Sequence, residues 1–124
     1  MSIETDFVAV AQAWAPLTAL VGDRVSQHAA AQGTPLPIVV FNASHLPQEG
    51  LDGDVQVDEF TIVAECWGAS AASAGQVADE LTNAINAHDA ASGALSVTAT
   101  SRQSVYDEEL ELDGYVLAFQ WMRL

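Results

Sequence analysis

The pattern of apolar and polar positions opens with a helical period. Five apolar residues in segment 7–21 recur at steps of three and four, which places them on one face of an amphipathic helix: Phe7, Val10, Trp14, Leu17 and Val21. Pro16 interrupts this face, because a proline inside a helix removes one backbone hydrogen bond. We therefore expect a kink near Ala15 or two short helices, with Gly22 ending the helical segment.

A connector follows the first helical segment. Residues 26–37 show no convincing period, and Pro35 and Pro37 disfavour helix for the residues before them. Residues 38–41 (Ile-Val-Val-Phe) are β-branched and aromatic, which predicts a strand buried on both faces. Arg24 lies just before this connector and is one of three cations in a very acidic chain, so we expect it to have a carboxylate partner within or between subunits.

A polar segment and a second strand come next. Residues 44–58 carry four carboxylates, Pro47 and the hairpin-type pair Asp52-Gly53, which together predict a long hairpin arm. Alternation then predicts a strand with one apolar face, formed by Phe60, Ile62, Ala64 and Cys66.

The last third of the chain predicts a helix and two strands. A helix entry near residue 70 is indicated by Ser73-Ala74-Gly75-Gln76, a capping-box pattern, although Ser70 is an earlier capping candidate. Val77, Leu81 and Ile85 continue at helical spacing, and residues 95–100 and 115–122 alternate as strands. An acidic turn, residues 107–113, separates these strands.

The order of elements predicts an α+β domain spanning residues 1–124. We expect a mainly antiparallel four-stranded sheet, two helices packed on one face, and a protruding hairpin arm. The final strand is mostly apolar on both faces, and Trp121 belongs to its aromatic stripe. One face can pack on helices, and the other needs more chain or a neighbouring subunit, which favours an oligomer.

Composition narrows the classes of function. The chain of 124 residues has 17 acidic residues, three arginines and no lysine, and its net charge is −14. This charge excludes the basic surface that nucleic-acid binding requires and disfavours anionic membranes. Acidic residues also keep a protein soluble, which by itself explains part of the excess.

Candidate chemistry is sparse. His28, His45 and His88 have no metal-ligand spacing to one another, and the single cysteine, Cys66, falls on the apolar face of a strand. The sequence contains no nucleophile elbow, and a small hydrolase would need a pocket of perturbed titratable groups that no motif indicates. We expect no enzymatic activity, no metal and no cofactor.

The order and motifs of the chain resemble one protein family. A kinked helix ends in Gly22-Asp23-Arg24-Val25, and a segment from Gln32 to Phe41 leads into the first strand. The second strand ends in Cys66-Trp67-Gly68 before a Ser/Ala-rich helix. This arrangement is similar to the tail completion (tail terminator) proteins of long-tailed bacteriophages and gene transfer particles.

The resemblance implies a structural protein of the virion neck, made in the bacterial host cytoplasm. It implies a homo-oligomeric ring, commonly a hexamer, that caps the tail tube, stops its polymerisation and joins tail to head. The implied partners are the tail tube protein and a head–tail connector. DNA would pass the pore without specific binding, and acidic side chains lining that pore would keep DNA from adhering.

Two hypotheses from different classes stay open. In the first, the ring-forming protein makes its contacts through sheet edges and acidic segments, and the candidate interface residues are Arg24, Glu49, Asp52, Asp54, Asp107, Glu108, Glu109, Glu111 and Trp121. In the second, a monomeric acidic module mimics nucleic acid and blocks a basic partner. Such a mimic would bind its partner with a steep salt dependence.

Overall fold

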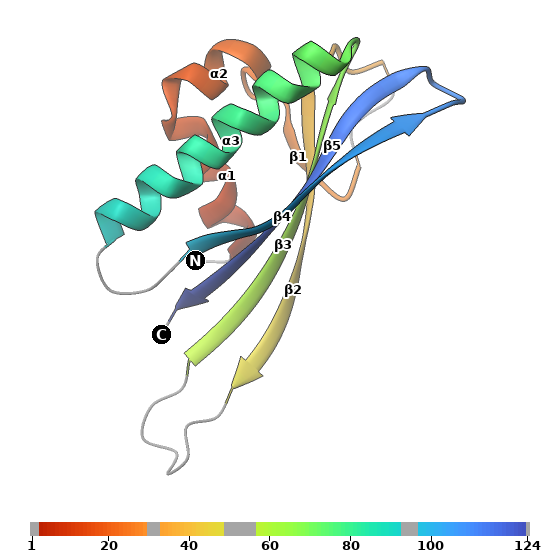
Figure 1. Cartoon of the computed structure of the whole chain (residues 1–124). Coiled ribbons are helices and arrows are strands. Elements are labelled where there is room, and N and C mark those ends of the chain that lie inside the picture. The colour runs from red at the N-terminus through yellow and green to blue at the C-terminus, as the bar shows by residue number, and fades with distance from the viewer. Residues whose placement is uncertain (1–2, 30–32, 49–56, 93–96, 124) are drawn as a thin grey trace.

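Helices cover one face of a twisted sheet in this protein (Figure 1). The computed structural model describes residues 3–29, 33–48, 57–92 and 97–123, and this part of the chain forms three helices and five strands. The helices are α1 (Ile3–Ala13), α2 (Ala15–Val21) and α3 (Ala71–Ser92). The strands are β1 (Val25–Gln27), β2 (Ile38–Gln48), β3 (Val57–Gly68), β4 (Val97–Asp107) and β5 (Leu112–Arg123).

The sheet has the strand order β1-β2-β3-β5-β4. β1 runs parallel to β2, and the other neighbouring strands are antiparallel. The α+β class is therefore right, but the prediction of a four-stranded antiparallel sheet with two helices is wrong. The missed strand has three residues, which is too short to show a period-two pattern, and the third helix arises because the N-terminal helical segment divides in two.

The break between α1 and α2 lies beside Pro16, as the sequence predicts. Trp14 is extended (φ −92°, ψ 103°), and Pro16 occupies the first turn of α2, where its missing N–H has no intrahelical partner to lose. The Trp14 carbonyl accepts hydrogen bonds from the backbone N–H groups of Leu17 and Thr18 (3.1 and 3.0 Å). Gly22 ends α2 with a positive φ of 59°, so its predicted role as a helix stop is confirmed.

The α3 helix begins at the earlier of the two predicted caps. The Ser70 hydroxyl accepts a hydrogen bond from the Ser73 backbone N–H (3.1 Å), while Ser73 itself lies inside the helix. Ser70 is therefore the residue that satisfies a free amide of the first turn. Val77, Leu81 and Ile85 are fully buried, so the predicted apolar face of this helix is confirmed.

The core lies between the helices and one face of the sheet. The Phe7 ring of α1 packs 4.5 Å from the Phe41 ring and 6.5 Å from the Phe119 ring, between centroids. Full burial of each such side chain contributes about 2–3 kcal/mol to folding. The predicted apolar face of β3 is confirmed, since all four of its members are buried: Phe60, Ile62, Ala64 and Cys66.

Two hairpins extend the sheet in opposite directions (Figure 1). β2 and β3 pair without interruption from Ile38↔Trp67 to Gln48↔Val57, so much of the predicted polar arm is regular sheet. The loop that joins them, residues 49–56, lies outside the described residues. β4 and β5 project past α3 and end in the acidic turn, which the sequence located correctly.

Candidate assembly interface

The face of the sheet opposite the helices is the first part of the candidate interface. β2 places Ile38 and Val40 on this face, β3 places Val63 and Trp67 there, and β5 contributes Val116. Val63 is 37% exposed, whereas Ile38 and Val40 are 9% and 7% exposed. The apolar content predicted for this face is present, and the described helices do not cover it.

Trp67 covers part of this face by lying on a glycine. Trp67 and Gly114 are directly opposite one another in the β3–β5 ladder. A Cβ atom at Gly114 would come within 2.7 Å of the Trp67 ring, so only glycine leaves room for the ring. The Trp67 indole N–H donates to the Glu65 carboxylate (3.1 Å), which fixes the ring over β5.

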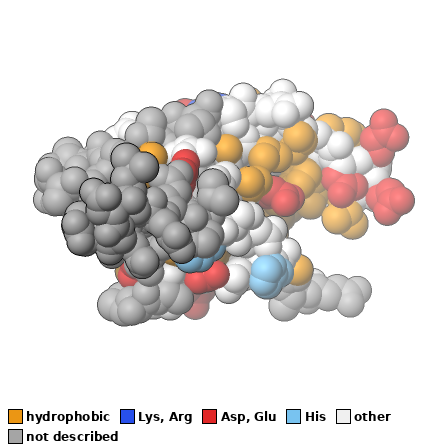
Figure 2. All heavy atoms as spheres, turned by 90° about the horizontal axis from the view of Figure 1, so that it is seen from below, with side chains coloured by type: hydrophobic (Ala, Val, Ile, Leu, Met, Phe, Trp, Pro, Cys, Tyr) orange, Lys and Arg blue, Asp and Glu red, His pale blue; other side chains and the backbone are white. Residues whose placement is uncertain are grey.

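The β4–β5 turn is the second part of the candidate interface. The Asp107 carboxylate accepts a hydrogen bond from the Leu110 backbone N–H (3.0 Å), and Glu111 adopts a positive φ of 53°. The turn exposes Glu108, Glu109 and Glu111 and, among them, Leu110, which is 66% exposed. Figure 2 shows acidic and hydrophobic side chains together at the right-hand end of the molecule, where Figure 1 places this hairpin.

A groove joins the two parts. It has a volume of about 260 Å³ and is lined by apolar residues from the sheet and the turn, including Ile38, Trp67, Leu110 and Leu112. Two carboxylates, Glu65 and Asp107, lie on its wall. The surface can therefore accept an apolar side chain beside a positive charge. The sequence prediction missed this groove, although Leu110, a leucine inside an acidic turn, indicated an apolar contact there.

Arg24 lies away from the turn, where α2 ends and β2 begins. Its guanidinium donates to the Leu20 and Pro37 backbone carbonyls, each at 3.1 Å. Its own backbone carbonyl accepts from the Val39 N–H (3.0 Å). Within the described residues, these side-chain partners are carbonyls, since the free carbonyls of a helix C-terminus are suited to a cation. A carboxylate partner on a neighbouring subunit stays a prediction.

The other predicted interface residues are placed as follows. The turn brings together Asp107, Glu108, Glu109 and Glu111. Trp121 lies at the opposite end of β5, is 5% exposed, and packs against His88 with ring centroids 5.2 Å apart. Three residues lie outside the described part of the chain: Glu49, Asp52 and Asp54.

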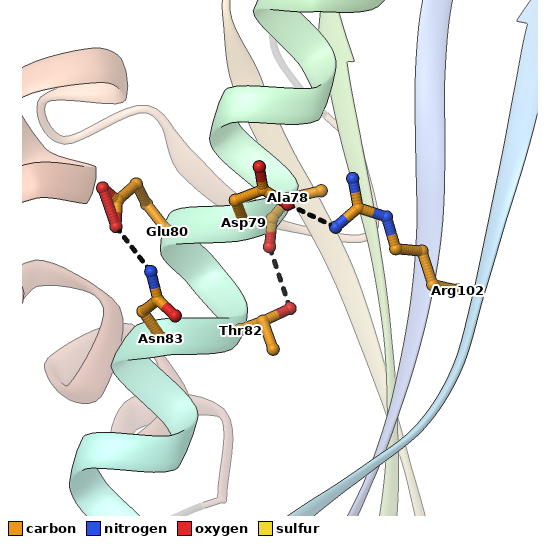
Figure 3. A network of polar contacts seen from close by, with 6 residues as sticks. All are labelled: Ala78, Asp79, Glu80, Thr82, Asn83 and Arg102. Carbon is orange, nitrogen blue, oxygen red and sulfur yellow. Dashed lines mark hydrogen bonds and ion pairs between the residues drawn. The ribbon is translucent and has the colours of Figure 1, made fainter.

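Arg102 forms a small polar cluster that the prediction did not include. It extends from β4 to α3, where its guanidinium contacts the Asp79 carboxylate at 2.6 Å (Figure 3). It also lies 4.6 Å from the centroid of the Tyr115 ring. The hydrogen bond to Asp79 is the main cause that raises the pKa of Arg102 above its usual value. The cluster directs the positive charge of β4 toward the helix.

Two further observations concern the reactivity of the described residues. Burial raises the pKa of the Cys66 thiol to about 12, so this cysteine stays protonated and unreactive near neutral pH. Within residues 3–29, 33–48, 57–92 and 97–123, no group of three or more His, Cys, Asp or Glu residues is arranged to hold a metal ion. None of the described helices is long and apolar enough to cross a membrane.

Comparison with known proteins agrees with this picture. The family description "Tail completion protein gp17" matches residues 7–123, nearly the whole chain. No curated protein matches the sequence. A solved structure titled "Virion of native gene transfer agent (GTA) particle" contains a chain with a similar fold, at a TM-score of 0.75 and 20% sequence identity. The alignment covers 98% of the present chain and 93% of the chain in that particle.

Proposed function

Because this chain belongs to the tail completion protein gp17 family, we propose that residues 1–124 act as one domain that assembles into a ring, with six copies as the expected number. The ring caps the head-proximal end of the tail tube, stops tube polymerisation and joins the tail to the head. The observation that carries this proposal is the family match over residues 7–123. In this proposal the chain works in the particle by assembly, as a structural protein.

The β4–β5 turn is the proposed contact to the tail tube protein or to the head–tail connector. It presents Leu110 and Tyr106, which are 66% and 56% exposed, together with the carboxylates of Glu108, Glu109 and Glu111. The cations Arg24 and Arg102 are already engaged within the subunit. A surface of this kind fits a partner that supplies positive charge and an apolar pocket.

The net charge of the chain supports a second part of the proposal. A ring of copies carrying −14 each would repel the phosphate backbone, so DNA would pass the pore without specific binding. The alternative hypothesis, a monomeric mimic of nucleic acid, also explains the charge. It does not explain why the tail completion description matches the chain from residue 7 to residue 123.

Electron microscopy of the purified protein, alone and mixed with tail tubes, tests the proposal. We expect a ring on one end of each tube and tubes that no longer elongate. A protein that leaves tube ends bare and tube growth unchanged would contradict it.

The double variant Glu108→Gln, Glu109→Gln tests the turn. These changes remove two charges from exposed side chains and should weaken docking to tubes or heads. The matched control is Glu4→Gln with Asp23→Asn, which removes the same charge from elsewhere on the surface. Equal docking by the two variants would exclude the turn as the contact.

A further inference from the structure

Acidic side chains are distributed unevenly over the sheet. The central strand β3 carries Asp58, Glu59 and Glu65. On one side of the sheet, β1 and β2 carry none, and on the other side β4 carries none before its last residue, Asp107. Proteins usually protect exposed sheet edges with charged side chains or proline, because unpaired backbone groups attract another strand. In a chain with 17 acidic residues, both sides of the sheet are free of acidic residues up to Asp107.

β4 provides one edge that can accept a strand. It is the last strand of the described sheet and pairs only with β5. A register shift between Ala99 and Ser101 disturbs its first half, so the regular part is residues 101–106. Its side chains at Ser101, Gln103 and Ser104 are exposed. Arg102, the cation of this segment, pairs with Asp79 on α3 (Figure 3), so its charge is offset within the subunit, and the segment has no acidic side chain before Asp107.

β2 provides the other edge. β1 pairs with β2 only from Val39 to Phe41, so in the described chain the outer side of β2 has no strand beside it from residue 42 onward. Pro47 lacks an N–H and limits pairing at the far end, which leaves residues 42–46. At about 3.3 Å per residue, this segment and residues 101–106 of β4 span similar lengths of roughly 17–20 Å.

We propose that β4 of one copy pairs through residues 101–106 with residues 42–46 of β2 in the next copy, so that one sheet continues across the subunit boundary. The partner is another copy because molecules carrying −14 each repel one another least where both surfaces lack acid. Two different edges make a head-to-tail contact, which can close into a ring, whereas β4 pairing with itself would stop at a dimer. This inference rests on the proposed ring.

Two edge variants test the pairing by native mass spectrometry. The β4 variant is Ser101→Glu with Gln103→Glu, and the β2 variant is Asn42→Asp with Ser44→Glu. Each adds two acids to one edge, and aspartate at position 42 can still bond His28, which contacts the Asn42 carboxamide oxygen. The matched control, Gln76→Glu with Asn86→Asp, adds the same charge to exposed positions of α3, outside both edges.

We expect the wild type and the control to form the same oligomer, and each edge variant to be a monomer. A 1:1 mixture of the two edge variants should form a heterodimer and nothing larger, because each variant retains the edge that the other has lost. Self-association of either edge variant to the wild-type size would overturn the inference. A β2 variant that dimerises alone would also overturn it, since that result indicates β4–β4 pairing.

Hydrogen exchange of the wild-type protein gives a test that needs no variant. Amides in residues 42–46 and 101–106 should exchange more slowly in the assembled protein than after dilution to monomers, and equal exchange would contradict the pairing. An assay of tube capping distinguishes failure of the strand pairing from failure of the proposed function. Tubes capped equally by the wild type and both edge variants would overturn the pairing alone. Wild-type rings that do not bind tubes would overturn the proposed function alone.

Discussion

At the scale of single residues, Gly114 is a position where a missing side chain makes room for a ring. We predict that Gly114→Ala destabilises the fold by about 1–3 kcal/mol, because the added Cβ atom would lie 2.7 Å from the Trp67 ring and force it off β5. The displaced ring would also lose its hydrogen bond to Glu65. Urea unfolding measures the loss, and a change in tryptophan emission reports the movement of the ring.

Gly75→Ala is the matched control for this glycine. Gly75 lies inside α3, and the nearest atom to an added Cβ, on the Tyr115 ring, is 3.6 Å away, an ordinary contact. Alanine in a helix interior is more stable than glycine by about 0.5–1 kcal/mol, so this variant should gain stability. If Gly114→Ala were as stable as the wild type, the Trp67 ring would not be what prevents a side chain at position 114.

Arg24 joins α2 to β2 through two backbone carbonyls. We predict that Arg24→Met costs about 2 kcal/mol in urea unfolding, because the Leu20 and Pro37 carbonyls each lose a charged donor. The Arg24→Lys variant should recover only part of this stability, since an ammonium group lacks the planar fork that reaches both carbonyls.

Arg102→Met provides the comparison for Arg24. The Arg102–Asp79 pair has side chains that are 40% and 64% exposed, and exposed ion pairs contribute at most about 1 kcal/mol. The cost at position 102 should therefore be below the cost at position 24. The reverse order would show that Arg24 is not the stronger structural contact. The sequence marked Arg24 as important, but nothing in it distinguishes a carbonyl partner from a carboxylate partner.

At the scale of elements, the start of α3 shows which of two serines caps the helix. Ser70→Ala should destabilise the protein by about 1 kcal/mol, because the Ser73 N–H loses its acceptor. Ser73→Ala should have little effect or a slightly stabilising one, since Ser73 lies within the helix, where alanine is favoured. Thermal unfolding of both variants checks the difference, and an equal cost at both positions would contradict the Ser70 cap.

Elements in which apolar residues recur at a regular spacing could be predicted from the sequence, and elements without such spacing could not. The buried faces of α3 and β3 follow from spacing alone, as does the break at Pro16. β1 has three residues, and its pairing with β2 depends on Arg24, which binds Pro37 and Val39 thirteen or more residues away. Such a contact exists only after the connector folds back, so local patterns do not contain it.

At the scale of the whole molecule, the candidate interface is less predictable than the fold. The acidic turn could be located in the sequence because charge and turn residues are local. The groove at its base could not, since Ile38, Trp67 and Leu112 come from three strands that meet only in the folded sheet. The acid-free edges also needed the strand order, because only the order β1-β2-β3-β5-β4 puts β4 at one side of the sheet and leaves β2, beyond the short β1, at the other.

The charge of the whole molecule leads to a prediction about salt. The acidic side chains behind the net charge of −14 repel one another in the compact state, and this repulsion outweighs attractive contacts such as the exposed Arg102–Asp79 ion pair. Raising NaCl from 10 to 100 mM shortens the Debye length from about 30 to about 10 Å and should therefore stabilise the fold. We expect a gain on the order of 1 kcal/mol, or roughly 4 °C in Tm for a chain of this size.

Assembly would also raise Tm, so the salt effect is best measured on the β2 and β4 edge variants, which we expect to be monomers. Calorimetry at a fixed protein concentration gives their Tm at each salt concentration. Adding the changes Glu108→Gln, Glu109→Gln and Glu111→Gln should reduce the salt-dependent gain, because three exposed charges are removed from one turn. A Tm that falls with salt would instead mean that attraction between charges outweighs their repulsion. Copies that carry −14 each also repel one another, so the same screening should strengthen assembly of the wild type. Its oligomer should dissociate more readily as salt is lowered.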